Sequence, residues 1–150
     1  MKMTRARSAF LFLAFALPPL SGAGTESIGS LRTLQGPVFL SRNGQERAVT
    51  QPERLYQQDV VRTGKAGSAG LLLRDDTAIS LGPESRLALE QFTFAPAQGR
   101  LGLVARLFKG TMAFLSGQIA RLAPNAVKVE TPEATVGIRG TYFLVQAEEK

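Results

Sequence analysis

The sequence predicts an all-β fold: short strands in a solenoid-like or jelly-roll-like β-domain that follows an N-terminal signal peptide. Two observations predict it. Turn residues such as Gly, Asn and Asp recur about every eight to twelve residues, and the short segments between them mostly alternate apolar and polar residues. The 150-residue chain contains no cysteine, so packing without disulfides must hold this domain together.

The first 23 residues have the three-part pattern of a secretory leader. Lys2, Arg5 and Arg7 precede an apolar run over 9–17, and the small residues 21–23 follow. We expect cleavage after Ala23 and a periplasmic or secreted protein. A retained membrane anchor is the alternative, although the run is shorter than the roughly 20 apolar residues of a membrane span. Cleavage would leave 127 residues (150 − 23) with a net charge of +3 (15 − 12).

The remaining chain is predicted to contain a flexible lead-in over 24–33 and one β-domain over 34–150. Asn43-Gly44 separates the extended segments 38–42 and 45–49, which is typical of a hairpin with a type I′ turn. Further strands are expected over 56–62, 69–74, 77–81, 86–94, 101–108 and 111–115. Turns are expected over 63–68, 75–76, 82–83, 95–99, 109–110 and 116–117, and a polar connection over 118–125.

The segment 101–108 fits both helical and strand spacing. Leu101, Val104 and Leu107 recur as on a helix, whereas Leu103, Ala105 and Leu107 recur as on a strand. Gly102 lowers the helix propensity, and the surrounding segments are all predicted strands, so we favour a strand.

The end of the chain is predicted to form three short strands. A strand over 127–131 ends at Pro132, which has no N–H for a ladder. A second strand starts near Ala134 and is interrupted by Gly137 and Gly140, which leave room for a bulge or a close backbone approach. The last strand covers 142–146.

Two groups of residues resemble the FecR-type domain, a periplasmic β-domain of bacterial iron-uptake regulators. The early group is Asp59, Thr63, Gly64, Asp75 and Asp76, and the closing group is Thr131, Pro132, Gly137, Arg139, Gly140 and Thr141. The resemblance implies a stand-alone, secreted FecR-like domain that acts in envelope signalling or scaffolding. Those regulators also carry a cytoplasmic anti-sigma segment and a membrane helix. A cleavable leader is predicted here instead, so direct control of a sigma factor is not expected.

Most of these motif residues are expected to be structural. Arg139 should pair with a buried carboxylate, and Asp59 is the proposed partner. Gly137 and Gly140 should serve backbone geometry. Asp75 and Asp76 are expected to form a turn rather than a cation site, because no further acidic ligands are spaced nearby.

Protein binding is the predicted function, by addition of a partner's strand to the last strand. The residues of that strand are Tyr142, Phe143, Leu144, Val145 and Gln146. An envelope protein is the expected partner, of unknown identity. A glycan- or peptidoglycan-binding module is the alternative, and a partial domain that needs a partner to complete its sheet is a third hypothesis.

Composition argues against other classes. The chain has no histidine, so a Ser-His nucleophile is excluded, and no metal site, cofactor or enzymatic activity is expected. Basic residues are scattered among acidic ones, so no nucleic-acid partner is predicted. No segment after the leader is long and apolar enough to cross a membrane. The sequence leaves the oligomeric state open.

Overall fold

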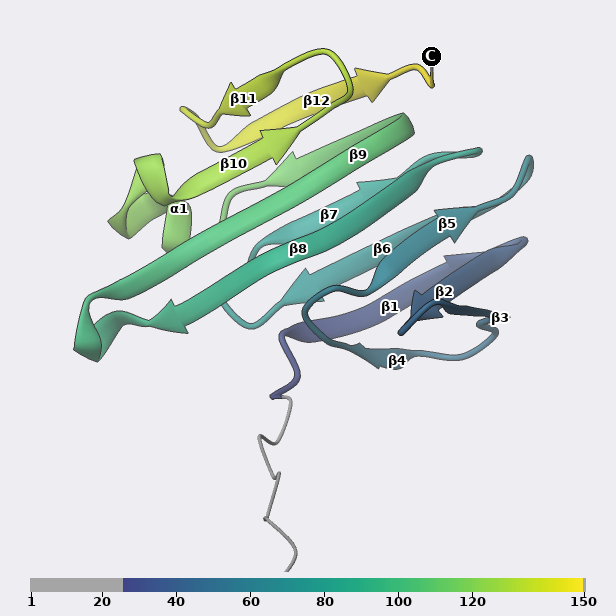
Figure 1. Cartoon of the computed structure of the whole chain (residues 1–150), viewed down its shortest axis with the longest axis horizontal. Coiled ribbons are helices and arrows are strands. Elements are labelled where there is room, and N and C mark those ends of the chain that lie inside the picture. The colour runs from purple at the N-terminus through teal and green to yellow at the C-terminus, as the bar shows by residue number, and fades with distance from the viewer. Residues whose placement is uncertain (1–25, 150) are drawn as a thin grey trace, which may run out of the picture.

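A computed structural model describes residues 26–149 and confirms the all-β prediction (Figure 1). The predicted signal peptide lies outside the described residues. The strands form one strongly curled, mostly antiparallel sheet with the shape of a half-barrel. No helix in residues 26–149 is long and apolar enough to span a bilayer.

Twelve strands and three short helical segments follow one another along the described chain. The strands are β1 Gly29–Gln35, β2 Val38–Arg42, β3 Gln45–Ala48, β4 Glu53–Leu55, β5 Val60–Thr63, β6 Ser68–Leu73, β7 Ala78–Leu81, β8 Arg86–Ala95, β9 Arg100–Leu115, β10 Val127–Glu130, β11 Thr135–Gly137 and β12 Tyr142–Ala147. The helical segments are η1 Pro96–Gln98, α1 Gln118–Leu122 and η2 Pro124–Ala126.

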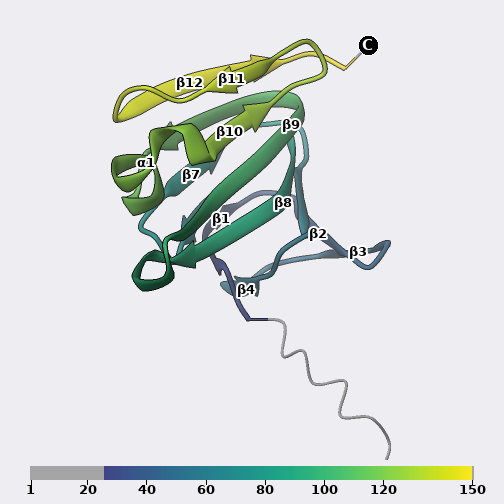
Figure 2. The same ribbon diagram turned by 60° about the vertical axis from the view of Figure 1, so that its left-hand side comes forward.

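A long bent hairpin organises the sheet. Strand β9 pairs antiparallel with β8 over its first part and with β7 over its last four residues. The change of partner occurs at Gly110, which has a φ of +94° and faces Ser85 in the β7–β8 connection. Gly110 is suited to this bend because a side chain is strained at that φ. The bend turns the two parts of the hairpin into two walls that face each other (Figure 2).

Each wall continues outward from the bent hairpin. One wall runs from β8 through β5 and β2 to β3, and the other runs from β7 through β6 and β1 to β4. On the far side of β9, β10 pairs parallel with its first part and carries β11, while β12 pairs antiparallel with its last part. The two walls therefore end at β3 and β4, and the chain itself connects these strands (Figure 2).

The space between the walls is filled by one apolar core. Its largest fully buried side chains include Phe114, Leu31, Leu87 and Leu107, which come from both walls. Every buried side-chain nitrogen and oxygen of residues 26–149 has a hydrogen-bond partner. The core of the described domain therefore leaves no buried side-chain polar group unsatisfied.

Three sequence predictions are corrected. Residues 29–33, expected in a flexible lead-in, form most of β1, and Leu31 is fully buried against the core. The expected turn at 109–110 is a bend inside the continuous strand β9. The expected polar connection over 118–125 contains α1, because Ile119 is buried and secures this segment to the core.

Of the strand expected over 56–62, only Val60 onward is a strand, whereas the hairpin at Asn43-Gly44 and the strand over 101–108 are confirmed. Asn43 and Gly44 both have positive φ, of 53° and 77°, between β2 and β3, as a type I′ hairpin requires. Residues 101–108 are part of β9, so the ambiguous segment is a strand. Strand β10 ends at Glu130, and Thr131 separates it from Pro132.

Candidate functional site

Strand β12 is positioned by its ladder with the end of β9. Tyr142 lies opposite Leu115 and Ala147 opposite Gly110. Phe143 packs inward, and its ring stacks on Phe114 with 4.9 Å between centroids. Val145 and Ala147 are also buried, so every second residue holds the strand to the core.

Three residues of β12 face away from the domain, and we call them the β12 edge: Tyr142, Leu144 and Gln146. No described strand other than β9 pairs with β12. The N–H of Ser116 donates to the carbonyl oxygen of Thr141 at 2.8 Å. Backbone groups alternate in an antiparallel ladder, so odd-numbered residues bond β9 and the β12 edge presents its N–H and C=O groups outward.

The side chains of the β12 edge continue an apolar outer surface. Tyr142 is 61% exposed and Leu144 is 72% exposed. Leu115 lies opposite Tyr142 and is 43% exposed, and Ala113 lies opposite Leu144. Exposed apolar groups beside unpaired backbone donors and acceptors are the feature that natural edge strands usually avoid.

A shallow hollow lies next to the entry of β12. It is formed by η2 and the segment between β11 and β12, and Arg139, Ile138 and Asn125 line it. Gly140 borders it on one side and Lys128 on the other. No aspartate or glutamate lines this hollow, which leaves it positively charged.

Arg139 does not have its expected role. It is exposed, and it makes no hydrogen bond or ion pair within residues 26–149. The predicted Arg139–Asp59 pair is therefore wrong. Asp59, 1% exposed, instead accepts two hydrogen bonds from Arg42, from Nε at 2.9 Å and from Nη2 at 2.8 Å. The sequence missed Arg42 because the contact depends on the pairing of β2 with β5, in which Ser41 lies opposite Val60 and Arg42 therefore lies beside Asp59.

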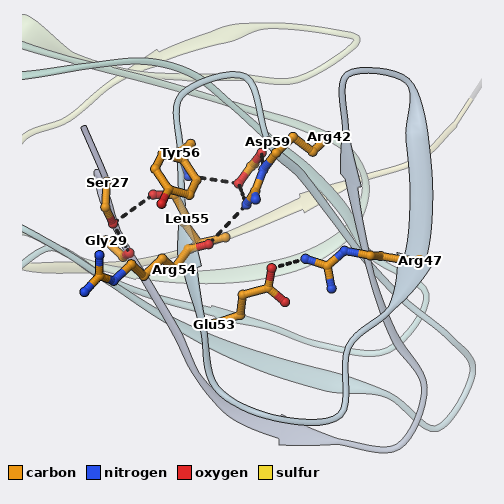
Figure 3. A network of polar contacts seen from close by, with 9 residues as sticks. All are labelled: Ser27, Gly29, Arg42, Arg47, Glu53, Arg54, Leu55, Tyr56 and Asp59. Carbon is orange, nitrogen blue, oxygen red and sulfur yellow. Dashed lines mark hydrogen bonds and ion pairs between the residues drawn. The ribbon is translucent and has the colours of Figure 1, made fainter. Parts of the chain in front are cut away.

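The Arg42–Asp59 pair belongs to a polar network that joins the two ends of the curled sheet (Figure 3). Arg42 also donates to the carbonyl oxygen of Arg54 in β4 at 3.1 Å, and the N–H of Tyr56 donates to Asp59 at 2.8 Å. Arg47 of β3 pairs with Glu53 of β4 nearby. These bonds close the gap between the outermost strands of the two walls, so we assign Asp59 a structural role.

Asp75 and Asp76 form the predicted turn, and Asp75 does more than turn the chain. Its fully buried carboxylate accepts hydrogen bonds from the N–H and the hydroxyl of Thr77. It also accepts a bond from the N–H of Ile119, at 3.2 Å, which ties α1 to the β6–β7 turn. Asp76 adopts a left-handed φ of 68°. The described residues hold no cluster of three or more acidic side chains that could bind a metal ion.

Thr63 and Gly64 also secure a turn. The buried hydroxyl of Thr63 donates to the carbonyl oxygen of Gly82 at 2.7 Å and accepts from the N–H of Ser85 at 2.9 Å. The N–H of Gly64 donates to the carbonyl oxygen of Pro37. In the early group, Asp59, Thr63 and Gly64 therefore fix the loops at the two ends of the β5–β8 pairing, whereas Asp75 and Asp76 fix the β6–β7 turn.

The closing group shapes the connections before β12. The hydroxyl of Thr131 accepts a bond from the N–H of Ala134 at 3.1 Å, which fixes the turn after Pro132. Gly140 has a φ of 122°, and its carbonyl oxygen accepts from the Ser116 hydroxyl at 2.9 Å. Thr141 is held to Ser116 as well. Gly137 lies in β11 with open space at its Cβ position and needs no special φ.

The described arginines elsewhere are often paired with carboxylates. Hydrogen bonding from Arg62 lowers the pKa of the Glu46 carboxyl, against the opposing effect of desolvation. Arg106 bonds Glu130 across the β9–β10 pair, and this bond raises the pKa of Arg106. These pairs lie on the outer surface of the sheet, and Arg106 and Glu130 line an open hollow together with Phe108 and Thr135.

The family described as FecR protein matches residues 59–150, which is more than half of the chain. The chain belongs to the FecR family. The match includes both groups of motif residues and all of β12. No curated protein and no solved structure matches the chain.

Membership of the FecR family agrees with the geometry. FecR domains are associated with envelope signalling and are generally non-catalytic. The residues that carry the resemblance to the family lie in two parts of the domain. The structural ones, such as Asp59 and Asp75, lie buried at turns and at the seam of the curled sheet. Arg139 and β12 lie together at an exposed end of the domain.

Proposed function

We propose that this FecR-family chain is a non-enzymatic protein-binding module of the bacterial envelope. After removal of its leader it would reside in the periplasm, where its partner is another envelope protein. The partner contributes an extended segment that adds as a strand to the β12 edge. Main-chain hydrogen bonds supply affinity in this binding mode, and alternate side chains supply specificity.

The unpaired outer edge of β12 carries the proposal. The outward N–H and C=O groups of Tyr142, Leu144 and Gln146 form a ready template for another strand. The rest of the strand is already secured, because Phe143 and Val145 are packed in the core. A partner can therefore dock without rearrangement of the domain.

Leu144→Pro tests the proposal at a single hydrogen bond. The N–H of Leu144 faces away from β9, so proline removes a donor of the free edge and none of the β9 ladder. Leu144→Thr is the matched control. It also removes the leucine side chain, but threonine keeps the backbone N–H and, as a β-branched residue, favours a strand. Both variants should retain the thermal stability of the unmodified chain to within a few degrees.

The measurement is in-cell crosslinking of the tagged, exported protein, followed by mass spectrometry. We expect an envelope protein to be captured by the unmodified chain and by Leu144→Thr, and to be lost with Leu144→Pro. Equal capture by all three chains would reject strand addition. Recovery of cell-wall fragments alone would instead support the glycan- or peptidoglycan-binding function, which a pulldown on purified cell wall would check.

A further inference from the structure

We propose that the resting occupant of the β12 edge is a second copy of this chain, paired antiparallel to the first about a two-fold axis at Leu144. This inference rests on the proposed strand addition, and it names a second copy of the chain as the strand that occupies the β12 edge first. A heterologous envelope partner would then compete with the second copy for the same edge.

The register follows from the backbone. In an isologous antiparallel strand pair every contact away from the two-fold axis occurs twice. Only residues with outward N–H and C=O groups can form the new hydrogen-bonded pairs, so outward residues must lie opposite outward residues and the axis must pass through a residue. Centring on Leu144 pairs the three residues of the β12 edge with one another, with Tyr142 opposite Gln146 of the second copy. Centring on any other residue of β12 would place at least one of the three opposite a residue outside the edge.

The side chains suit this register. Leu144 would lie against Leu144 of the second copy, and both are otherwise 72% exposed. Phe143 would lie opposite Val145 on the inner face. The β12 edge carries no charge, so the two copies meet without repulsion along the strand.

Charge complementarity at the ends of the strand pair supports the same register. Arg139 precedes the bend at Gly140, five residues before the axis, and Glu149 follows the end of β12, five residues after it. Because the two strands are antiparallel, the pairing brings Glu149 of one copy to the same end of the strand pair as Arg139 of the other, twice in the dimer. Arg139 has no partner within residues 26–149 and lies beside a hollow without acidic residues. Glu149 is 64% exposed, and its bond of 3.6 Å to Lys109 is long, so its carboxylate is accessible to a second cation.

Sedimentation velocity of the exported, purified chain over a range of concentrations tests the inference. We expect a monomer–dimer equilibrium for the unmodified chain and a monomer for Leu144→Pro. Arg139→Glu should raise the dimer Kd about tenfold, because two symmetry-related pairs become repulsive. Combining Arg139→Glu with Glu149→Arg should restore most of the affinity.

The outcomes separate this inference from the proposed function. A chain that stays monomeric at the highest concentration overturns the dimer, while capture of an envelope protein that depends on Leu144 would leave strand addition standing. A dimer that persists in Leu144→Pro overturns the β12 edge as its interface. A dimer that Arg139→Glu leaves unchanged overturns the register centred on Leu144.

Discussion

Arg42 holds Asp59 through two parallel hydrogen bonds, from Nε to Oδ1 at 2.9 Å and from Nη2 to Oδ2 at 2.8 Å. Arg42 is on β2, in one wall of the curled sheet, and its Nη2 also reaches the carbonyl oxygen of Arg54 in the other wall. One guanidinium therefore joins the two ends of the sheet. The side-chain hydrogen bond with Asp59 raises the pKa of Arg42.

Arg42→Ala should lower the free energy of unfolding by about 2–4 kcal/mol, because it leaves the carboxylate of Asp59 buried with only one donor, the N–H of Tyr56. Urea denaturation followed by circular dichroism measures the change. Arg47→Ala is the control, since Arg47 is 53% exposed and its pair with Glu53 should contribute less than about 1 kcal/mol. Equal losses in the two variants would contradict the special role of Arg42.

The contrast between Arg42 and Arg139 shows what the sequence could and could not predict. Local rules succeeded at Asn43-Gly44, where two residues alone set the turn. They also succeeded near Pro132, because proline has no N–H with which to continue a strand. The partner of Asp59 depends on the pairing of β2 with β5, whose register places Ser41 opposite Val60 and so brings Arg42 beside Asp59. No local pattern records that proximity.

The core positions of β8 follow its local pattern. Leu87 and Leu89 are buried, as the alternation of apolar and polar residues indicates. A register shift between Leu89 and Gln91 then moves Phe92 into the core and leaves Phe94 only partly buried. This bulge breaks the period of two, and it coincides in the sequence with the adjacent polar residues Glu90 and Gln91.

Asp75→Ala should destabilise the protein by about 2–4 kcal/mol. The carboxylate is fully buried, and its removal leaves the N–H of Ile119 and the groups of Thr77 without their acceptor. Hydrogen exchange should report the loss first at the amide of Ile119. Asp76→Gly is the control, because Asp76 has a left-handed φ that glycine adopts freely, and it should change stability by no more than about 0.5 kcal/mol. A protected Ile119 amide in Asp75→Ala would contradict the assignment.

Gly110→Ala should cost at least about 2 kcal/mol. A Cβ at this position would lie 2.4 Å from the Cα of Ser85, at a φ of +94° that L-residues rarely adopt. Gly137→Ala is matched to it, because nothing lies within 4 Å of its Cβ position, and should stay within about 0.5 kcal/mol of the unmodified protein. Thermal denaturation compares the two. A tolerated alanine at 110 would mean that the bend of β9 does not depend on glycine.

The pKa of Glu46 provides a prediction in pH. Hydrogen bonding from Arg62 lowers this pKa below 4.5 in the folded protein. A depressed pKa stabilises the fold above the unfolded pKa, and the contribution is lost as the pH falls through the folded pKa. Arg62→Gln should therefore return the Glu46 pKa toward 4.5 in an NMR titration of the carboxyl carbon. Lys65→Gln removes a cation that does not act on Glu46 and should leave its pKa unchanged.

Arg139→Ala decides between the structural role expected from the sequence and the binding role inferred from the fold. A buried ion pair would cost about 3–5 kcal/mol when broken. Because Arg139 is exposed and has no partner within residues 26–149, we expect a change within about 0.5 kcal/mol. Urea denaturation must be done below the dimer Kd, so that loss of self-association does not lower the apparent stability. Arg106→Ala, which breaks two exposed pairs with Glu90 and Glu130, should be the more destabilising of the two variants. If Arg139→Ala alone lowered the free energy of unfolding by several kcal/mol, this residue would have a structural role.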